Sequence, residues 1–592
     1  MSALAGLLLQ AAPSPGVGTP APTSLPSVIP SPSPSPSPAP TFGGGVVTFS
    51  FLLSVLVWAP FVAAVVVAIM PVPRRRNQRR LLGIAFWVNL GLLFLTAIAY
   101  SQFSVYGSGL QFEERWPWMP AIGVSYHLGV NGVDMALLLL SGLIGVVACL
   151  AAYNLREQAR EFFTLLLLTQ WAINGAITAQ NFLLLVLFWS AAIVPVALLV
   201  GGWSGQRRWR ATARLAAYWS LGAAALLVAG LLLAVSTGTT SLEISDLSQA
   251  VAPHQTQVVV AVLVLVAAAT RLPLVPLHGW AREVLAEVHP AVAVLLAGSV
   301  SRLGGLVLLE LYVGANHDGA RSVAWLVAAV AVATVVWAGL VAFATRDVRR
   351  VAAYLALIPG GVTVLGVAGL SPLSIDGTAL ALFAGGLAAA LIAGAGATFA
   401  DHAQGRNVSV IAGLASRVPR LSWLLVGATL AVLCVPFMAT FPAAVMVLFG
   451  SMRTQPAATF LVIAGLAVAA AAIAWLLHRV LFGAPNPDSP QVADVSLSEA
   501  WYLGILVGAL LWVGLVPGGP KVANIPIFDP GLVNVITQAT SELSSSYVPP
   551  APPGASPSPA AQPSPGAAPN PSPGASSPSP VPGASPAVPP TP

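Results

Sequence analysis

Residues 322 to 344 read SVAWLVAAVAVATVVWAGLVAFA, and no charged side chain interrupts this run. A helix of about 20 apolar residues is long enough to cross a hydrocarbon core roughly 30 Å thick. Similar runs recur from about Phe51 to Pro517, and they are continuously apolar rather than alternating, as the strands of a membrane barrel would be. The sequence therefore predicts an all-α integral membrane protein.

The composition of the whole chain agrees with that prediction. Of the 592 residues, 57% are apolar and 7% are charged, whereas a soluble domain carries about 25% charged residues. The net charge of +6 comes from arginines in short clusters between apolar runs, so it indicates membrane topology and no nucleic-acid partner. The two cysteines, Cys149 and Cys434, both lie in apolar runs, which leaves no disulfide framework and no Cys-based metal site.

We predict about fourteen membrane spans, with basic clusters after the first, third, fifth, ninth and eleventh. All of these clusters follow odd-numbered spans and so lie on the same side of the membrane. The positive-inside rule places that side in the cytoplasm, which puts both termini outside a bacterial cytoplasmic membrane. The predicted spans are 50–71, 81–101, 132–153, 162–179, 181–201, 215–236, 257–288, 290–314, 322–344, 351–370, 378–400, 421–450, 457–482 and 499–517.

The two ends of the chain differ from the predicted membrane domain, residues 50–517. Residues 1–45 begin with a short apolar stretch and continue as a Pro/Ser tract, which is typical either of a weak signal segment or of an extended external tail. Residues 518–592 form the predicted external C-terminal segment, which is rich in Pro, Ser and Ala from 547 onward. Segments of this composition cannot bury a core.

Prolines interrupt two of the predicted spans near their middles. Residues 271–278 read RLPLVPLH in span seven, and residues 435–442 read VPFMATFP in span twelve. If spans four to eight and nine to thirteen are two five-helix repeats, the broken helix is the fourth of each. Paired broken helices indicate a transport site, because unwound backbone must face a polar cavity or other protein. Ordinary proline kinks are the alternative.

Ionisable side chains within spans are costly and are therefore candidates for function. The candidates for a proton path or an ion site are Arg271, His278, Arg302, Glu310 and Asp134. Arg302 and Glu310 lie about two turns apart on nearly the same face of span eight, although both could instead satisfy buried packing contacts. His278 could be a relay member or a hydrogen-bonding clasp at the helix break.

A proton relay needs groups that gain and lose protons near neutral pH. Arginine stays protonated in proteins, so Arg271 and Arg302 can set electrostatic fields but exchange protons poorly. The chain has one lysine, Lys521, and it lies outside every predicted span. A complete relay of lysines and glutamates cannot be assembled from these residues.

Residues 271–280, RLPLVPLHGW, together with LAGSVSR at 296–302, resemble a motif of the antiporter-like membrane subunits of respiratory complex I, most closely its M chain (chain 4), and of the related Mrp-type cation/proton antiporter subunits. The resemblance covers about residues 126–483. Shorter supporting stretches are Gly129 to Asp134, Phe188 and Trp189 with Pro195, Asp347 to Tyr354, Ile411 to Leu414 with Pro419, and Leu481 to Gly483.

The resemblance implies two inverted repeats and a proton path made by a Glu in span five, lysines in spans seven and eight, and a polar terminus in span twelve. This chain departs from that pattern at the positions that the resemblance assigns to the proton path. Its counterparts are Ser190 for the span-five Glu, Arg271 and Arg302 for the lysines, Pro359 for a His, and Ala444 for the span-twelve Glu. A GC-rich genome can favour Arg over Lys, but it does not explain Ser190 or Ala444.

The function implied is that of a membrane-arm, proton-translocation-type subunit of an NADH:quinone oxidoreductase in an electron transport chain, with the relay impaired, rerouted through Glu310 and water, or lost. Its partners would be other membrane subunits and the bilayer. We expect no cofactor on this chain, so quinone and redox centres would lie on partner subunits and any oxidoreductase activity would belong to the complex. A stand-alone or two-subunit cation/proton or bicarbonate-linked transporter, or a purely structural scaffold, are the alternatives.

Overall fold

The computed structural model describes residues 51–70, 78–104, 109–155, 157–205, 208–249, 251–402, 413–483, 494–516 and 531–545. The chain divides into two compact units, residues 1–49 and 50–592. Every described residue belongs to the second unit. The predicted N-terminal tail, residues 1–45, and the Pro-rich stretch from 547 lie outside the described residues.

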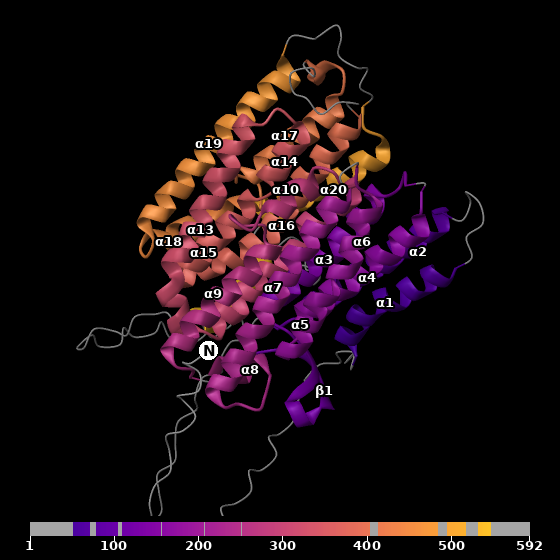
Figure 1. Ribbon diagram of the computed structural model, residues 1–592. Helices are drawn as coiled ribbons and strands as arrows, with labels where there is room; N and C mark the ends of the chain where they lie inside the picture. Colours follow the sequence, from indigo (N-terminus) through magenta and orange to yellow (C-terminus); the bar gives the residue numbers. More distant parts are fainter. Residues whose placement is uncertain are drawn as a thin grey trace, which may run out of the picture. The chain divides into compact units, whose positions relative to one another are not determined.

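The second unit is built almost entirely of helices (Figure 1). Within the described residues, twelve helices or runs of consecutive helices are long and apolar enough to cross a membrane, so the chain is a multi-pass integral membrane protein. The twelve are α1 (Leu52–Ile69), α2 (Gln78–Ser101), α3 (Gly132–Ala151), α5 (Phe182–Ala191) with α6 (Ile193–Gly202), α7 (Arg208–Thr237), α9 (His254–Arg271), α11 (Pro290–Gly298) with η2 (Val300–Arg302), α12 (Leu303–Val307) and η3 (Leu308–Gly314), α13 (His317–Ala344), α14 (Val348–Leu355) with α15 (Ile358–Gly369), α16 (Pro372–His402), α19 (Pro456–Phe482) and α20 (Leu497–Leu515).

Two further predicted spans coincide with helices outside that set of twelve. Span four corresponds to α4 (Ala159–Thr178), which carries the buried polar side chains Gln170 and Asn174 and packs against α1. Span twelve corresponds to α17 (Pro419–Val432) followed by α18 (Thr440–Met452), each too short to cross alone. The predicted helical membrane fold is confirmed, with about twelve candidate spans.

The helix α16 lies at the centre of the packing, and α1, α2 and α20 lie at its periphery. The most apolar stretch of α16 is completely buried, and α16 contacts α3, α11, α15 and α18 among others. Close approach here depends on glycine, since a Cβ at Gly386 would lie 2.6 Å from the carbonyl oxygen of Gly298. Large apolar side chains such as Trp87, Phe94 and Trp325 point outward instead, as a lipid-facing surface requires.

Both proline-rich interruptions predicted from the sequence are breaks in the helices. The helix α9 ends at Arg271, and α10 (Gly279–Leu285) begins only after residues 272–278. Neighbouring side chains and backbone satisfy polar groups at this break: Val275 N donates to Thr334 Oγ1 at 3.0 Å, and Trp280 Nε1 donates to the carbonyl of Thr270 at 2.8 Å. The second break, residues 433–439, separates α17 from α18.

Predicted span eight is less regular than the sequence suggests. Between Pro290 and Gly314 the chain passes from α-helix through a 3₁₀ turn and a short α-helix into a π-helical turn. The expectation that Arg302 and Glu310 share one face assumed uniform helical geometry, and that assumption is wrong for this segment. Wide π-turns are rare and often accompany functional positions.

The all-α prediction needs one correction, because a β-hairpin joins α2 to α3. Strands β1 (Gln111–Met119) and β2 (Val124–Val130) are antiparallel, with Glu114 opposite Leu128 and Trp116 opposite Tyr126. The short 3₁₀ turn η1 (Pro120–Ile122) connects them. Pairs of aromatic residues on one face stabilise such a two-stranded unit, and Trp116 stacks on Tyr126 with the ring centroids 5.5 Å apart.

The C-terminal segment contains a helix that the sequence pattern did not predict. The helix α21 (Leu532–Ser545) packs against α3 and α16. Its side chains Val535, Ile536 and Thr540 are buried, whereas Asn534 and Ser541 are exposed. The predicted external segment 518–592 is therefore partly folded onto the membrane domain.

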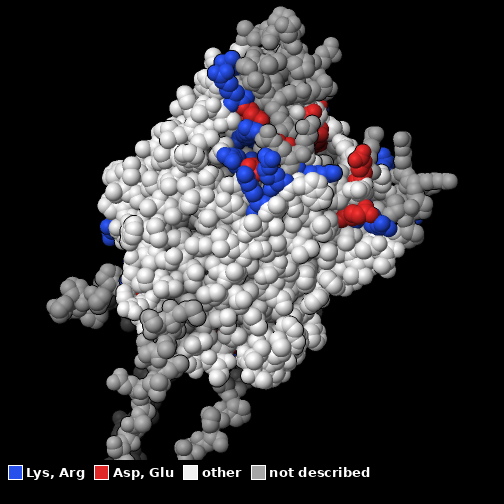
Figure 2. All heavy atoms as spheres, in the orientation of Figure 1, with Lys and Arg blue, Asp and Glu red and all other residues white. Residues whose placement is uncertain are grey.

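Charged side chains are unevenly distributed over the surface. Most of those visible in Figure 2 gather at one end, over the region where Figure 1 labels α10, α14 and α17. The remaining described surface on this face carries almost no visible charge. A surface with so few charged side chains matches the requirement of the hydrocarbon core for apolar side chains.

Candidate functional site

Arg271 lies at the last position of α9, just before the helix break, and is completely buried. Its guanidinium carbon lies 3.9 Å from the ring centroid of Trp219 on α7 and 4.8 Å from that of Trp189 on α5. The Nη2 group donates a hydrogen bond to the carbonyl oxygen of Trp189. Nε and Nη1 have no hydrogen-bond partner among the described residues. We call this arrangement the tryptophan cage.

The tryptophan cage holds Arg271 without a carboxylate among the partners named above. Ser190, the position that the resemblance aligns with a span-five Glu, directly follows Trp189 on α5 and is half-buried. In place of an ion pair, the guanidinium is held by two aromatic faces and a carbonyl, and each desolvated cation–π contact is worth about 2 kcal/mol. Trp280 supports the cage, because its ring meets Trp219 edge to face at 5.3 Å.

Arg302 lies at the end of η2 with 2% of its surface exposed. Its Nε and Nη1 have no hydrogen-bond partner within the described part of the chain. A Cβ at Gly385 of α16 would lie 3.4 Å from Arg302 Nη1 and 3.0 Å from the Cβ of Pro359. The structure thus brings Arg302 close to Pro359, and a proline side chain offers it no hydrogen-bond acceptor.

Asp134 and Glu310 come together although they are far apart in the sequence. Asp134 is completely buried in the first turn of α3, where its Oδ2 accepts a hydrogen bond from Asn131 N at 2.9 Å. Asn131 Oδ1 accepts in return from the amides of Val133 and Asp134, which closes a capping box. The Asp134 carboxyl group also contacts that of Glu310 on η3. We call these two residues the carboxyl pair.

The remaining candidates lie elsewhere. His278 is the N-cap of α10, half-buried, with its ring edge against Trp337 of α13 at 6.4 Å. Ala444 is buried on α18, which packs on α15 and α16. The structure therefore brings together one pair of the five candidates, Asp134 with Glu310, and gives Arg271, Arg302 and His278 separate surroundings. Among the residues that the structure describes, no three His, Cys, Asp or Glu side chains are placed to hold a metal ion.

Residues 179–471 match the family described as NADH:quinone oxidoreductase/Mrp antiporter, TM. Over 507 residues the chain is 30% identical to the NAD(P)H-quinone oxidoreductase chain 4 1 of Synechococcus sp. (strain JA-2-3B'a(2-13)), which covers 84% of this chain and 94% of the relative. The chain belongs to this family. The resemblance inferred from residues 271–302 is thereby confirmed.

Solved structures show the same fold for these antiporter-like subunits. A chain of respiratory complex I from Thermus thermophilus with bound NADH superposes with a TM-score of 0.72 at 21% identity, covering 83% of this chain and 99% of that one. A chain of the Mrp complex from Dietzia sp. DQ12-45-1b gives 0.72 at 18% identity, covering 85% and 100%. At these identities the likeness concerns the fold.

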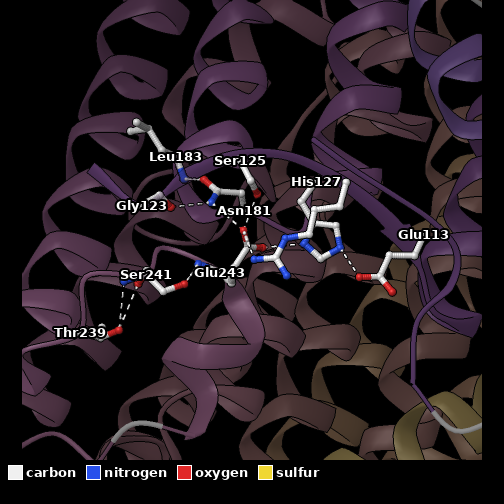
Figure 3. Close-up of polar contacts among 10 residues, drawn as sticks. Glu113, Gly123, Ser125, His127, Asn181, Leu183, Thr239, Ser241 and Glu243 are labelled. Atoms are coloured by element: carbon white, nitrogen blue, oxygen red, sulfur yellow. Dashed lines mark hydrogen bonds and ion pairs between the residues drawn. The ribbon is translucent and has the colours of Figure 1, made fainter. Parts of the chain in front are cut away.

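Outside the spans, this family member carries a polar cluster that the sequence analysis missed. Figure 3 shows His127 of β2 between two carboxylates, Glu243 and Glu113. His127 Nδ1 lies 2.6 Å from Glu243 Oε2, and Nε2 lies 2.8 Å from Glu113 Oε1. Glu243 also accepts hydrogen bonds from Ser125 Oγ and, at 3.3 Å, from Asn181 Nδ2. We call these five residues the hairpin cluster.

Electrostatics in the hairpin cluster favour an ionised Glu243. Burial raises the pKa of Glu243, but the hydrogen bonds from His127, Ser125 and Asn181 outweigh burial and hold the pKa below its usual range. Arg115 adds a weaker attraction at 3.5 Å. The cluster ties the β-hairpin to the segment before α8 (Ile244–Gln249), which is a structural role.

A second buried carboxylate, Glu114, anchors the same hairpin to α1. Its oxygens accept hydrogen bonds from Leu53 N at 2.7 Å, Ser54 N at 3.1 Å and Ser54 Oγ at 2.5 Å. Sequence patterns could not single out Glu114 or Glu243, because carboxylates in a connection between spans are ordinary and their partners lie more than fifty positions away.

Proposed function

We propose that the chain is a membrane-arm subunit of a complex I-like NADH:quinone oxidoreductase assembly in a bacterial cytoplasmic membrane. The observation that carries the proposal is the 30% identity over 94% of a chain 4 relative. The solved complex I chain with the same fold is matched over 99% of its length. Other membrane subunits would be the partners, and quinone and redox centres would lie on them rather than on this chain.

The topology we propose has fourteen crossings, two inverted five-helix repeats, and both termini outside. The helix α4 and the broken pair α17 and α18 would complete the count of fourteen. In this arrangement α9 with α10, and α17 with α18, are the fourth members of their repeats. The breaks at residues 272–278 and 433–439 support this assignment, since broken helices at matching positions are a feature of transport folds.

The proton path of this subunit would be altered. Arg271 rests on the tryptophan cage, and Arg302 lies against α16, in the neighbourhood of Pro359. A guanidinium keeps its proton in proteins, so these residues supply fixed positive charge where the relatives use lysine. We propose that protons do not pass through the two arginines and that transport, if retained, is routed through Glu310 and water.

Purification from the native membrane in mild detergent tests the assembly. The tagged chain is isolated at low salt and the co-purifying chains are identified by mass spectrometry, with an unrelated tagged multi-pass protein as the control. Recovery of quinone-site and peripheral redox subunits, absent from the control, is the expected result. Recovery of the chain alone, or with one small subunit, would contradict the proposal.

A two-subunit or stand-alone cation/proton or bicarbonate-linked transporter is the second candidate. It is supported by the equally high TM-score, 0.72, with a chain of the Mrp complex. Cation-driven pH changes in vesicles that contain the purified chain and no redox subunits would favour this candidate. Inert vesicles, with redox subunits recovered from the native membrane, would exclude it.

A further inference from the structure

The carboxyl pair lies where the beginning of α3 meets the π-turn of η3. Asp134 is completely buried, and its Oδ2 accepts a hydrogen bond from Asn131 N. Its Oδ1 is also buried and receives no N–H or O–H donor from the described residues. The carboxyl group of Asp134 interacts with that of Glu310, and Glu310 lines the same cavity as Asn131 and Gly132.

Contact between two carboxyl groups has a chemical consequence. An ionised carboxylate can only accept hydrogen bonds, whereas a protonated one can also donate. Asp134 is buried and Glu310 is half-buried, so two carboxylates in contact there would repel each other in a medium of low dielectric constant, and such a pair holds one proton between its members. The two residues then carry a single negative charge.

The described groups that line the cavity beside the carboxyl pair supply no positive charge that could take the place of that proton. The cavity beside Glu310 has no Arg, Lys or His side chain among its described lining residues, and its one other ionisable side chain is Glu113 of β1. On α16, Asp376 accepts a hydrogen bond from Thr540 of α21. The described groups that line the cavity are thus acidic or neutral.

The cavity connects the carboxyl pair to the surface. It has a volume of about 630 Å³ and is lined by Glu310, by Asn131 and Gly132 beside Asp134, and by residues of α8 and α21. Glu113, Gln249 and Ser541 of its lining are exposed. By the predicted topology this mouth, near the hairpin, faces the outside. A polar cavity of this size holds many water molecules.

The helix α21 forms one wall of this cavity and is packed tightly. A Cβ at Gly132 would lie 2.1 Å from the carbonyl oxygen of Val535 and 3.0 Å from the Cβ of Ala539. Only glycine at this position allows α21 to lie so close to the first turn of α3. Thr540 fixes the other side of α21 through its hydrogen bond to Asp376.

We propose that Asp134 and Glu310 form a site that holds one shared proton and exchanges it with outside water through the cavity walled by α21. The inference deepens the proposed function and rests on it for the direction of proton movement. In a subunit whose buried arginines keep their protons, the carboxyl pair supplies a group that can release one. Exchange needs only that a water molecule in the cavity accept the proton from Glu310 and return it.

Carbodiimides test the site because they react with protonated carboxyl groups. Right-side-out membrane vesicles containing the full chain are treated at neutral pH with a membrane-impermeant, water-soluble carbodiimide, and adducts are located by mass spectrometry. We expect an adduct on Glu310 or Asp134 that fades as the pH rises and is lost in Glu310→Gln. Glu114 is the matched control, because it is also buried but its oxygens already accept hydrogen bonds from N–H and O–H donors.

Three results would overturn the inference. No adduct from either this reagent or a hydrophobic carbodiimide would exclude the shared proton. An adduct from the hydrophobic reagent alone would exclude the route to the outside. Full labelling of Asp134 in Glu310→Gln would show that the proton is not shared.

The cavity itself is tested through its wall. In the chain with Ser541→Cys and Cys434→Ala, attachment of a bulky thiol reagent at position 541 should slow labelling of the carboxyl pair at least several-fold. Unchanged labelling after complete modification would overturn the proposed path. These measurements need no partner subunit, so their failure is distinguishable from a failure of the purification that tests the assembly.

Discussion

Arg271 and Asp134 are both completely buried at helix ends, yet their surroundings differ in kind. Two tryptophan rings and a carbonyl surround the guanidinium, which keeps its charge. Asp134 has a second carboxyl group against it and a water-accessible cavity beside that group. The first environment stabilises a permanent charge and the second makes a charge exchangeable. Four substitutions test this difference, from the largest expected effect to the smallest.

Trp219→Ala should have the largest effect. It removes a fully buried ring and the closest face on which the Arg271 guanidinium rests. A buried Trp→Ala change costs about 3–5 kcal/mol, and loss of the cation–π contact adds to it. Thermal unfolding in detergent measures the loss. Trp87→Ala, at a position 68% exposed on α2, should change the stability little, and equal losses would contradict the assigned role of the cage.

Glu243→Gln tests a third environment, in which a buried carboxylate accepts hydrogen bonds from neighbouring side chains. Losing charge-assisted hydrogen bonds should cost about 2 kcal/mol at pH 7. Because the folded-state pKa of Glu243 is lowered, its ionisation contributes stability above the unfolded value of about 4.3, and this contribution disappears as the pH falls through the folded value. The stability difference between wild type and Glu243→Gln should therefore shrink below about pH 4.3. Unfolding measured from pH 7 to pH 3 checks the trend, and a difference that grows on acidification would contradict it.

Arg271→Met should be tolerated far better than the loss of its cage. Replacing a buried charge with an apolar side chain of similar length removes a desolvation cost, while the carbonyl of Trp189 loses a donor at a cost of about 1–3 kcal/mol. The two effects oppose each other, so we expect a net change within about 1.5 kcal/mol. Detergent unfolding beside Trp219→Ala provides the comparison, and a larger loss for Arg271→Met would show that the charge itself holds the helices together.

Glu310→Gln should change stability least, by less than about 1 kcal/mol, because an amide can donate to the Asp134 carboxylate without a shared proton. Its effect should lie in proton binding. Asp134→Asn is the reciprocal variant and should behave alike. Titration of the purified chain against the wild type measures the protons bound, and an unchanged number in both variants would contradict a shared proton.

The sequence predicts the helices and the breaks because their signals are local. Runs such as 322–344 cross a bilayer by length alone, and the prolines at 273 and 276 cannot continue a regular helix. The sequence pattern did not reveal the hairpin, because its two strands within residues 111–130 are short and mixed in polarity and lie between long helices. The helix α21 was missed because its apolar residues are interspersed with Thr, Ser and Gln and it depends on α3 and α16 for packing.

The candidate residues were found from the sequence, but their partners were not. Each of Arg271, Arg302, Glu310 and Asp134 is conspicuous as a charge within an apolar run. What surrounds them depends on tertiary contacts between elements far apart in the chain, such as α5 and α7 around Arg271 or α3 beside η3. The π-turn that presents Glu310 to Asp134 also has no reliable sequence pattern.

Infrared difference spectroscopy tests the central contrast most directly, because the carbonyl stretch of a protonated carboxyl group is separate from the bands of a carboxylate. The purified chain is titrated through neutral pH as wild type, Glu310→Gln and Arg271→Met. The account predicts a protonated-carboxyl band that is present in wild type, retained in Arg271→Met and lost in Glu310→Gln. A band that is absent from wild type, or that persists in Glu310→Gln, would contradict it.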